Sequence, residues 1–198
     1  MIVKRLEDYL RKKILSELTR GRLGYDLSHT KAVVKKIKEI LENNPDLKLD
    51  RMVLIIAAYA HDWGYVGMFD NSRLAQIQEV IEAKADHMEN GAKKLRGLLE
   101  DDFFNFLTKA QKERAIHLVR VHDSLKDLKA PDELVLMEAD VLGSADLSLV
   151  KPTYNRQSNK EWVKQIREKK LPRFMTDFSK KELERLMKQR ERYYKEND

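Results

Sequence analysis

Apolar side chains recur every three or four residues along almost the whole chain, and this spacing restricts the fold more than any other feature of the sequence. In the first twenty residues it is followed by Val3, Leu6, Leu10, Ile14 and Leu18. Such residues line one face of an α-helix, and no segment shows the alternation of apolar and polar residues that is typical of a β-strand. Seven glycines and four prolines in 198 residues are also too few for a loop-rich β-sandwich. The sequence therefore predicts an all-α fold.

Capping residues predict where several helices begin. One helix is expected to start near Asp26, and Asp50 is expected to cap a mostly apolar segment, residues 52–63, that Gly64 stops. A short helix is expected around residues 74–81. Further starts are predicted where a capping residue precedes Glu or Gln by three positions, or where proline fits the first turn: Asp86 with Glu89, Thr108 with Gln111, Ser179 with Glu182, and Pro131. We expect a compact bundle of about eight or nine helices.

Composition excludes several classes of protein and site. The chain has no cysteine, which excludes disulfides, thiolate metal sites and cysteine nucleophiles. Its longest apolar run, residues 52–60, is far shorter than the roughly 20 residues that span a bilayer. The first ten residues become charged before the apolar core of a signal peptide could form. We therefore expect a soluble, cytoplasmic protein with no membrane partner.

Positive charge is concentrated at the C-terminal end. The formal net charge is +6, and residues 151–198 carry 15 Lys or Arg against eight Asp or Glu. This excess is compatible with an anionic partner such as a nucleic acid, and equally with a solvated helical surface. No aromatic-rich nucleic-acid-binding motif accompanies the basic residues. A nucleic-acid-binding or regulatory module is therefore an alternative that the sequence does not favour.

Polar side chains interrupt the apolar faces of several predicted helices. The six positions are His29, His61, Asp62, His87, His122 and Asp140. A single buried histidine is most often a hydrogen-bonded core residue, but an ionised carboxylate is costly to bury without a partner. Four histidines and two aspartates that all face inward are explained most simply by bound metal. Imidazole nitrogen and carboxylate oxygen together suit Mn²⁺, Fe²⁺, Co²⁺, Ni²⁺ or Zn²⁺.

The same residues lie in five segments that resemble the successive motifs of the HD-domain superfamily of metal-dependent phosphohydrolases. The segments are LSHT at 27–30, AHDWG at 60–64, DHMENGAKKLRGLL at 86–99, IHLVRVHD at 116–123 and MEADVLG at 137–143. The resemblance covers roughly residues 20–150 and is greatest to the small stand-alone HD hydrolases. It implies one HD-like helical domain over residues 1–198, with the motifs at 20–150 and a basic helical extension at 151–198 packed on it.

The resemblance also implies roles for the six polar residues. His29, His61, Asp62 and Asp140 match the core metal ligands, and His87 and His122 match the histidines that complete a second metal site. The cofactor would be one or two divalent ions (Mn, Fe, Co, Ni, Zn or Mg). The activity implied is cleavage of a phosphate ester or anhydride of a nucleotide or similar small molecule by a metal-activated hydroxide, with Asp62 as the catalytic carboxylate that bridges two ions. His117 matches no motif position and is expected at the surface or behind the ligands.

Contacts to the anionic substrate are predicted from loops that flank the motifs. Arg73, Lys126 and Lys129 occupy such loops, and Arg156 and Arg173 offer the same chemistry from the tail. The residues that follow the His61–Asp62 doublet include two aromatic side chains, Trp63 and Tyr65. They are candidates for stacking on a base or for a cavity wall. Many relatives have Lys after the glycine of the AHDWG segment, whereas this chain has tyrosine there.

A second class of enzyme fits the same ligand set. Some HD-fold proteins with six such ligands hold two irons and use oxygen to cleave carbon–carbon or carbon–phosphorus bonds. Metal content and an optical or EPR signal under air separate that activity from hydrolysis. The sequence leaves the substrate, the metal and the oligomeric state open.

Overall fold

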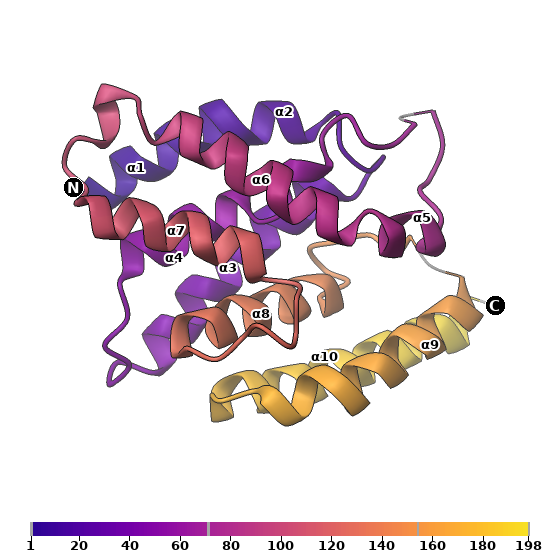
Figure 1. Cartoon of the computed structure of the whole chain (residues 1–198). Coiled ribbons are helices and arrows are strands. Elements are labelled where there is room, and N and C mark those ends of the chain that lie inside the picture. The colour runs from indigo at the N-terminus through magenta and orange to yellow at the C-terminus, as the bar shows by residue number, and fades with distance from the viewer. Residues whose placement is uncertain (1, 71, 154, 198) are drawn as a thin grey trace.

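The computed structural model describes residues 2–70, 72–153 and 155–197 and confirms the all-α prediction for them (Figure 1). About 71% of the chain is helical, and no strand occurs among the described residues. The helices are α1 (Ile2–Leu10), α2 (Ser16–Leu18), α3 (Asp26–Asn43), α4 (Arg51–Ala60), α5 (Ile77–Glu82), α6 (Lys84–Leu98), α7 (Lys109–Val121), α8 (Pro131–Ala145), α9 (Arg156–Gln165) and α10 (Asp177–Glu196). A π-helical segment, Arg11–Leu15, joins α1 to α2 without a break, and a second one, Ile166–Lys170, continues α9.

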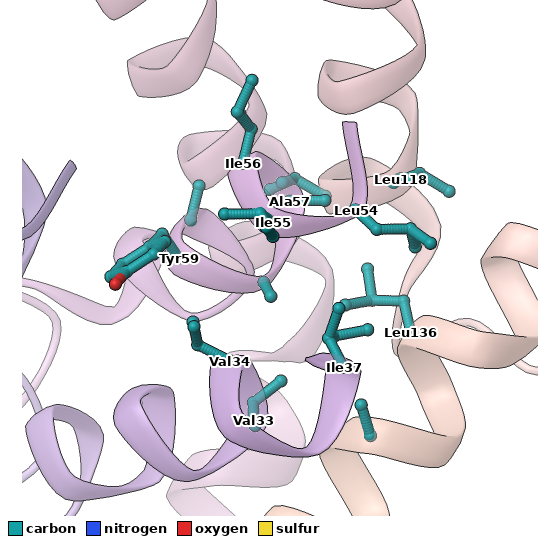
Figure 2. Packing of buried hydrophobic residues seen from close by; sticks show 14 of the residues in the cluster. Val33, Val34, Ile37, Leu54, Ile55, Ile56, Ala57, Tyr59, Leu118 and Leu136 are labelled. Atoms are coloured by element: carbon teal, nitrogen blue, oxygen red, sulfur yellow. The ribbon is translucent and has the colours of Figure 1, made fainter. Parts of the chain in front are cut away.

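Helix α4 forms the centre of the hydrophobic core. Every residue of this helix from Val53 to Ala60 is buried. In Figure 2, Leu54 of α4 faces the same core as Ile37 of α3, Leu118 of α7 and Leu136 of α8. A helix that is apolar on all sides is stable only when it is surrounded by other helices. The ends of α3, α4, α7 and α8 are thereby fixed relative to one another.

Most predicted helix starts are confirmed, and two are wrong. Asp50 caps α4 by accepting hydrogen bonds from the backbone N–H groups of residues 52 and 53, and Thr108 forms the predicted capping box with residue 111. Pro131 is the first residue of α8. Asp86 does not cap a helix, because α6 has already begun at residue 84. Ser179 is not a cap either, because Thr176 accepts the hydrogen bond from its backbone N–H.

Gly64 does not stop α4, as the sequence predicted, because that helix ends four residues earlier. The glycine lies in a short 3₁₀ turn, Trp63–Tyr65, that packs directly on α6. A Cβ atom at this position would lie 1.8 Å from the backbone oxygen of His87 and 2.7 Å from the backbone nitrogen of Gly91. Glycine therefore permits a backbone contact that holds the 61–62 doublet against α6.

Replacing Gly64 with alanine is expected to destabilise the protein by about 3 kcal/mol, because the colliding atoms belong to a helix backbone and cannot rotate away. The midpoint of thermal unfolding should fall by about 6–12 °C. Gly97→Ala is the matched control, since a Cβ there meets nothing within 4 Å, and alanine in a helix is about 1 kcal/mol more favourable than glycine. Equal midpoints for the two variants in a calorimetric scan would show that the close backbone contact does not require glycine.

The two C-terminal helices lie side by side, and α10 packs on α8 (Figure 1). Leu183 and Leu186 of α10 are buried, and the buried carboxylate of Glu138 in α8 accepts hydrogen bonds from the backbone and the hydroxyl of Thr176. Lys36 of α3 forms ion pairs with Asp146 and with Glu182 of α10. Apolar burial and paired charges therefore both hold the tail against the core. Among the described helices, none combines the length and the apolar character that crossing a bilayer requires.

Candidate metal centre

The first group of metal-ligating side chains comes from three different helices. His29 projects from α3, His61 directly follows α4, and Asp140 belongs to α8. The Nε2 atom of His29 lies 3.1 Å from Oδ1 of Asp140 and 3.1 Å from Nε2 of His61. The three donor atoms all lie within 4.8 Å of one another. This group could hold a metal ion.

The second group of metal-ligating side chains lies beside the first and includes Asp62, the residue that follows His61 in the chain. Asp62 follows His61, His87 projects from α6, and His122 directly follows α7. The Nε2 atoms of His87 and His122 are 3.3 Å apart, and each lies 3.7 Å from Oδ1 of Asp62. All three side chains are buried. This second group could also hold an ion.

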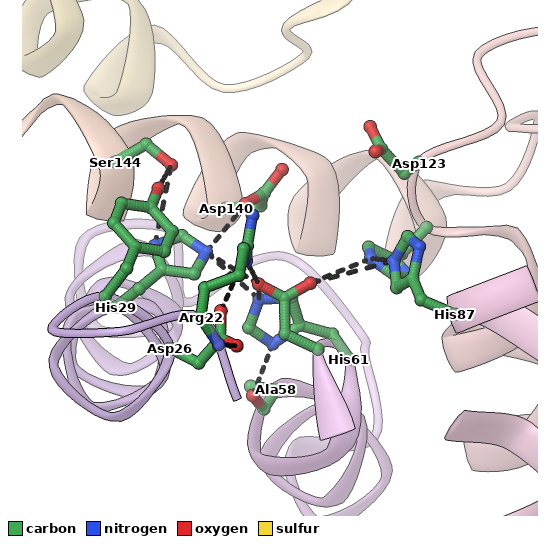
Figure 3. Close-up of polar contacts among 12 residues, drawn as sticks. Arg22, Asp26, His29, Ala58, His61, His87, Asp123, Asp140 and Ser144 are labelled. Carbon is green, nitrogen blue, oxygen red and sulfur yellow. Dashed lines mark hydrogen bonds and ion pairs between the residues drawn. The ribbon is translucent and has the colours of Figure 1, made fainter. Parts of the chain in front are cut away.

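Asp62 faces both groups with different oxygen atoms. Its Oδ1 is the atom near the second group, whereas its Oδ2 lies 3.5 Å from Nε2 of His29 and 3.4 Å from Nε2 of His61. Figure 3 shows His29 and His87 on opposite sides of His61. A carboxylate placed in this way can contribute one oxygen to each of two neighbouring ions. The structure brings all six predicted ligands together.

The donor atoms fit divalent cations. Donors bound to one ion at about 2.1 Å lie about 3.0–3.5 Å from one another, which matches the closest contacts within both groups. The Nδ1 atoms of His61 and His122 donate to the backbone oxygens of Ala58 and Val119, at 2.9 and 2.8 Å. When these rings are neutral, their Nε2 lone pairs therefore point inward, toward the Nε2 atoms of the other two histidines. A cation between such lone pairs relieves their repulsion, and backbone acceptors of this kind are typical behind metal-bound histidines.

Charges within the centre shift several pKa values. Burial lowers the pKa of His61, but the Asp62 and Asp140 carboxylates outweigh burial and raise it to about 9. Burial raises the pKa of Asp62, yet His61 and Arg22 hold it well below its usual range. For His87, burial and the neighbouring His122 lower the pKa to about 3. The centre thus presents ionised carboxylates together with a histidine, His87, that is neutral at physiological pH.

Arg22 belongs to the site, although no sequence pattern pointed to it. Its Nη2 donates to Oδ2 of Asp62 at 2.6 Å, and its Nε donates to Oδ1 of the buried Asp26, also at 2.6 Å. The guanidinium lies over the rings of Tyr25 and Tyr65, at 4.6 and 4.1 Å from their centroids. Arg22 lies in a turn before α3, outside any helical pattern, so only the fold brings it to the doublet.

Tyr25 and Ser144 lie behind His29. The Tyr25 ring stacks on the imidazole with centroids 4.9 Å apart, and its hydroxyl lies 2.9 Å from Oγ of Ser144. That Oγ lies 3.5 Å from Nδ1 of His29 (Figure 3). Ser144 follows Asp140 by four residues on α8, a spacing that places both on one face of the helix. This spacing is a signal from which the role of Ser144 could have been predicted.

A cavity of about 280 Å³ opens onto the metal centre. Its polar wall includes His29, Asp62, His122, Asp140, Arg22, Lys84, Asp123 and Lys170. Its apolar wall is built from α5 and from the segment that contains α9, and includes Ile77, Val80, Ile81, Trp162 and Ile166. The basic C-terminal segment therefore forms part of the cavity wall.

The loop residues predicted to contact the substrate do not line this cavity. Arg73 is exposed and pairs with Glu79, with Nη1 3.0 Å from Oε2. Lys126 and Lys129 are exposed on the loop before α8 and lie outside the cavity wall. The charged ends of these three side chains face solvent and lie outside the cavity that opens onto the metal centre.

The other candidate residues have mixed outcomes. Tyr65 is a cavity wall residue and stacks on the His87 ring at 3.9 Å, whereas Trp63 lies outside the wall and donates to Glu17. Arg173 donates to the backbone oxygens of residues 125 and 128, and Arg156 does not line the cavity. His117 is partly exposed and pairs with Glu133 at 2.9 Å, which agrees with the expectation of a surface position.

Comparison with known proteins agrees with the resemblance of the motifs to HD domains. The fold is similar to the crystal structure of a predicted HD superfamily hydrolase from an uncultured Thermotogales bacterium, with a TM-score of 0.55 and 18% sequence identity over 98% of this chain and 89% of that one. No curated protein matches the sequence. The HD domain family matches residues 26–145, which include all six donor residues. The chain therefore belongs to the HD domain family.

Proposed function

We propose that the protein is a metal-dependent phosphohydrolase that cleaves a phosphate ester or anhydride of a nucleotide or similar small molecule. The observation that carries this proposal is the position of Asp62 between two histidine-containing groups beside a cavity. We assign His29, His61 and Asp140 to one divalent ion, His87 and His122 to a second, and Asp62 to both. Such ions, when bound, supply a hydroxide nucleophile near neutral pH and offset negative charge on phosphate oxygens.

The surrounding residues would orient the ligands and exclude water. Arg22 holds Oδ2 of Asp62 at 2.6 Å, which fixes the rotation of the carboxylate. The backbone oxygen of Ala58 holds the proton of His61 on Nδ1 and leaves Nε2 free to bind metal. The apolar side chains of α5 and of the segment that contains α9 would exclude water once a substrate fills the cavity, and charged groups would then interact more strongly there than at an open surface.

A substrate panel tests the proposal directly. The purified protein, loaded in turn with Mn²⁺, Co²⁺, Ni²⁺ or Mg²⁺, is incubated with nucleotides and other small phosphate esters, and released phosphate or pyrophosphate is measured. We expect turnover of at least one member with at least one ion. A folded, metal-loaded protein that hydrolyses none of them would contradict the proposal. Iron-dependent oxygen consumption in its place would support the oxygenase alternative.

Metal binding is expected to release a proton and to strengthen as the pH rises toward 9. His61 is protonated on both ring nitrogens at pH 7 in the metal-free protein, because its pKa is raised to about 9, and Nε2 must lose its proton before it can bind metal. Affinity should therefore increase by about tenfold between pH 7 and 8 and less steeply as the pH approaches 9, where half of the His61 rings are already neutral. Titration calorimetry in two buffers of different ionisation enthalpy counts the protons released. Affinity that is constant over this range would contradict the assignment of His61 as a ligand.

A further inference from the structure

Two lysines and an aspartate form a charged cluster in the cavity wall, next to the metal centre. Asp123 lies between them: its Oδ2 is 2.8 Å from Nζ of Lys84, at the start of α6, and its Oδ1 is 3.3 Å from Nζ of Lys170. All three side chains line the cavity. Asp123 belongs to neither group of metal-ligating atoms. Metal binding alone therefore does not account for the cluster.

The charges of this cluster do not balance once the metal centre is filled. Lys170 also lies 3.3 Å from Asp140, but it contacts Oδ2, whereas Oδ1 is the oxygen that faces His29. A divalent ion bound beside Oδ1 would neutralise the negative charge of Asp140, so this carboxylate would no longer balance the charge of Lys170. Lys84 and Lys170 would then share the single carboxylate of Asp123, and one positive charge would remain in the cavity wall without a partner. A surplus of this kind favours an anionic ligand.

The position of Lys170 favours a role in the site over a purely structural one. The residue ends the π-helical segment Ile166–Lys170, and π-helical turns occur frequently at functional sites. Its side chain is mostly buried, and the apolar side chains of Ile166 and Trp162 line the same cavity. In such surroundings an ammonium group attracts an anion more strongly than it does in water. Residue 170 also lies beyond the 26–145 match, so the C-terminal segment adds this charge to the HD domain.

We propose that Lys84 and Lys170, positioned by Asp123, form an anion-binding subsite that holds the phosphate group of the substrate. The subsite rests on the proposed phosphohydrolase function and names the residues that recognise the phosphate. Asp123 is a positioning residue, because it holds both ammonium groups at the cavity. The lysine expected after the AHDWG segment is absent here, and these two lysines supply positive charge from other elements.

Calorimetric titration with inorganic phosphate tests the subsite in the Mn²⁺-loaded protein. Lys84→Gln and Lys170→Gln should each weaken phosphate binding by about tenfold or more, because each removes a charge-assisted hydrogen bond. Lys170→Arg should retain most of the affinity. Lys164→Gln is the matched control, because it removes the same charge from α9 at a side chain that is 72% exposed and lies outside the cavity. Equal affinity in the two glutamine variants, the control and the wild type would overturn the inference.

Two further measurements separate direct phosphate binding from an indirect effect through the metal ligands. The Mn²⁺ content of Lys170→Gln should equal that of the wild type; loss of Mn²⁺ together with phosphate affinity would show that the lysine acts only through Asp140, and would overturn its role in the subsite. Lys84 contacts no proposed ligand, so its variant reports on phosphate alone. Phosphate titration needs no turnover. A wild type that binds phosphate through both lysines but hydrolyses no ester would therefore contradict the proposed function and leave the subsite intact.

Discussion

Replacing Asp62 with asparagine is expected to abolish turnover, with kcat/KM reduced by at least about 1000-fold. Loss of a single electrostatic contact in an active site typically costs about 100- to 1000-fold, and this carboxylate faces both proposed ions. Asparagine preserves the volume of the side chain but removes its charge. Far-ultraviolet circular dichroism should show unchanged helix content, because Asp62 lies after the end of α4 and its side chain makes no capping hydrogen bond to the short 3₁₀ turn that follows it. Turnover and helix content together separate loss of chemistry from loss of the fold.

Asp177→Asn is the matched control for this variant. Asp177 is a carboxylate at the start of α10 whose side chain is 86% exposed, and it lies outside the cavity. The control should retain wild-type turnover. An Asp62→Asn enzyme that keeps more than about one tenth of the wild-type kcat/KM would show that the carboxylate does not bridge catalytic ions.

Metal removal is expected to lower the midpoint of thermal unfolding by about 10 °C. A ligand present at about a thousand times its dissociation constant stabilises the folded state by about 4 kcal/mol. In a chain of this size that free energy corresponds to a shift of roughly 8–16 °C. The ligands come from α3, α6 and α8 and from the ends of α4 and α7, so unfolding any of these helices would release an ion. The measurement is a calorimetric scan with and without a chelator.

The shift should be reversible and specific to the centre. Adding back Mn²⁺ in excess over the chelator should restore the midpoint, and Asp62→Asn should show little change with either reagent. If the chelator left the wild-type midpoint unchanged, the six side chains would have to be a set of internal hydrogen bonds without a bound ion.

The presence of helices could be predicted from the sequence more reliably than the residues at which they begin and end. Apolar spacing identified the helices because burial of one face decides whether a segment is helical. Asp86 and Ser179 were wrong as caps because suitable residues also occur inside first turns, where their acidic or hydroxyl side chains are favourable as well. The role of Gly64 depends on the backbone of His87, a residue distant in sequence, and no local pattern encodes that contact.

The donor set could be predicted because each member interrupts an apolar face. The surrounding charges could not. Arg22, Asp123 and Lys170 occupy a turn, a helix end and a π-helical segment, where the sequence has no periodicity that assigns a side chain to the interior. Arg73 and Lys126 are charged loop residues that the sequence does not distinguish from these three, but their side chains are exposed to solvent. In a chain with 36% charged residues, only the packing of the folded chain distinguishes the charged side chains that line the cavity from those that face solvent.

Metal content tests the central claim most directly. The protein is equilibrated with Mn²⁺, dialysed against metal-free buffer, and measured by inductively coupled plasma mass spectrometry together with protein concentration. The arrangement of two donor groups around Asp62 predicts two ions per chain in the wild type and a loss of bound metal in Asp62→Asn. Fewer than two ions in the wild type, or unchanged metal in the variant, would contradict the shared-carboxylate centre on which the proposed function depends.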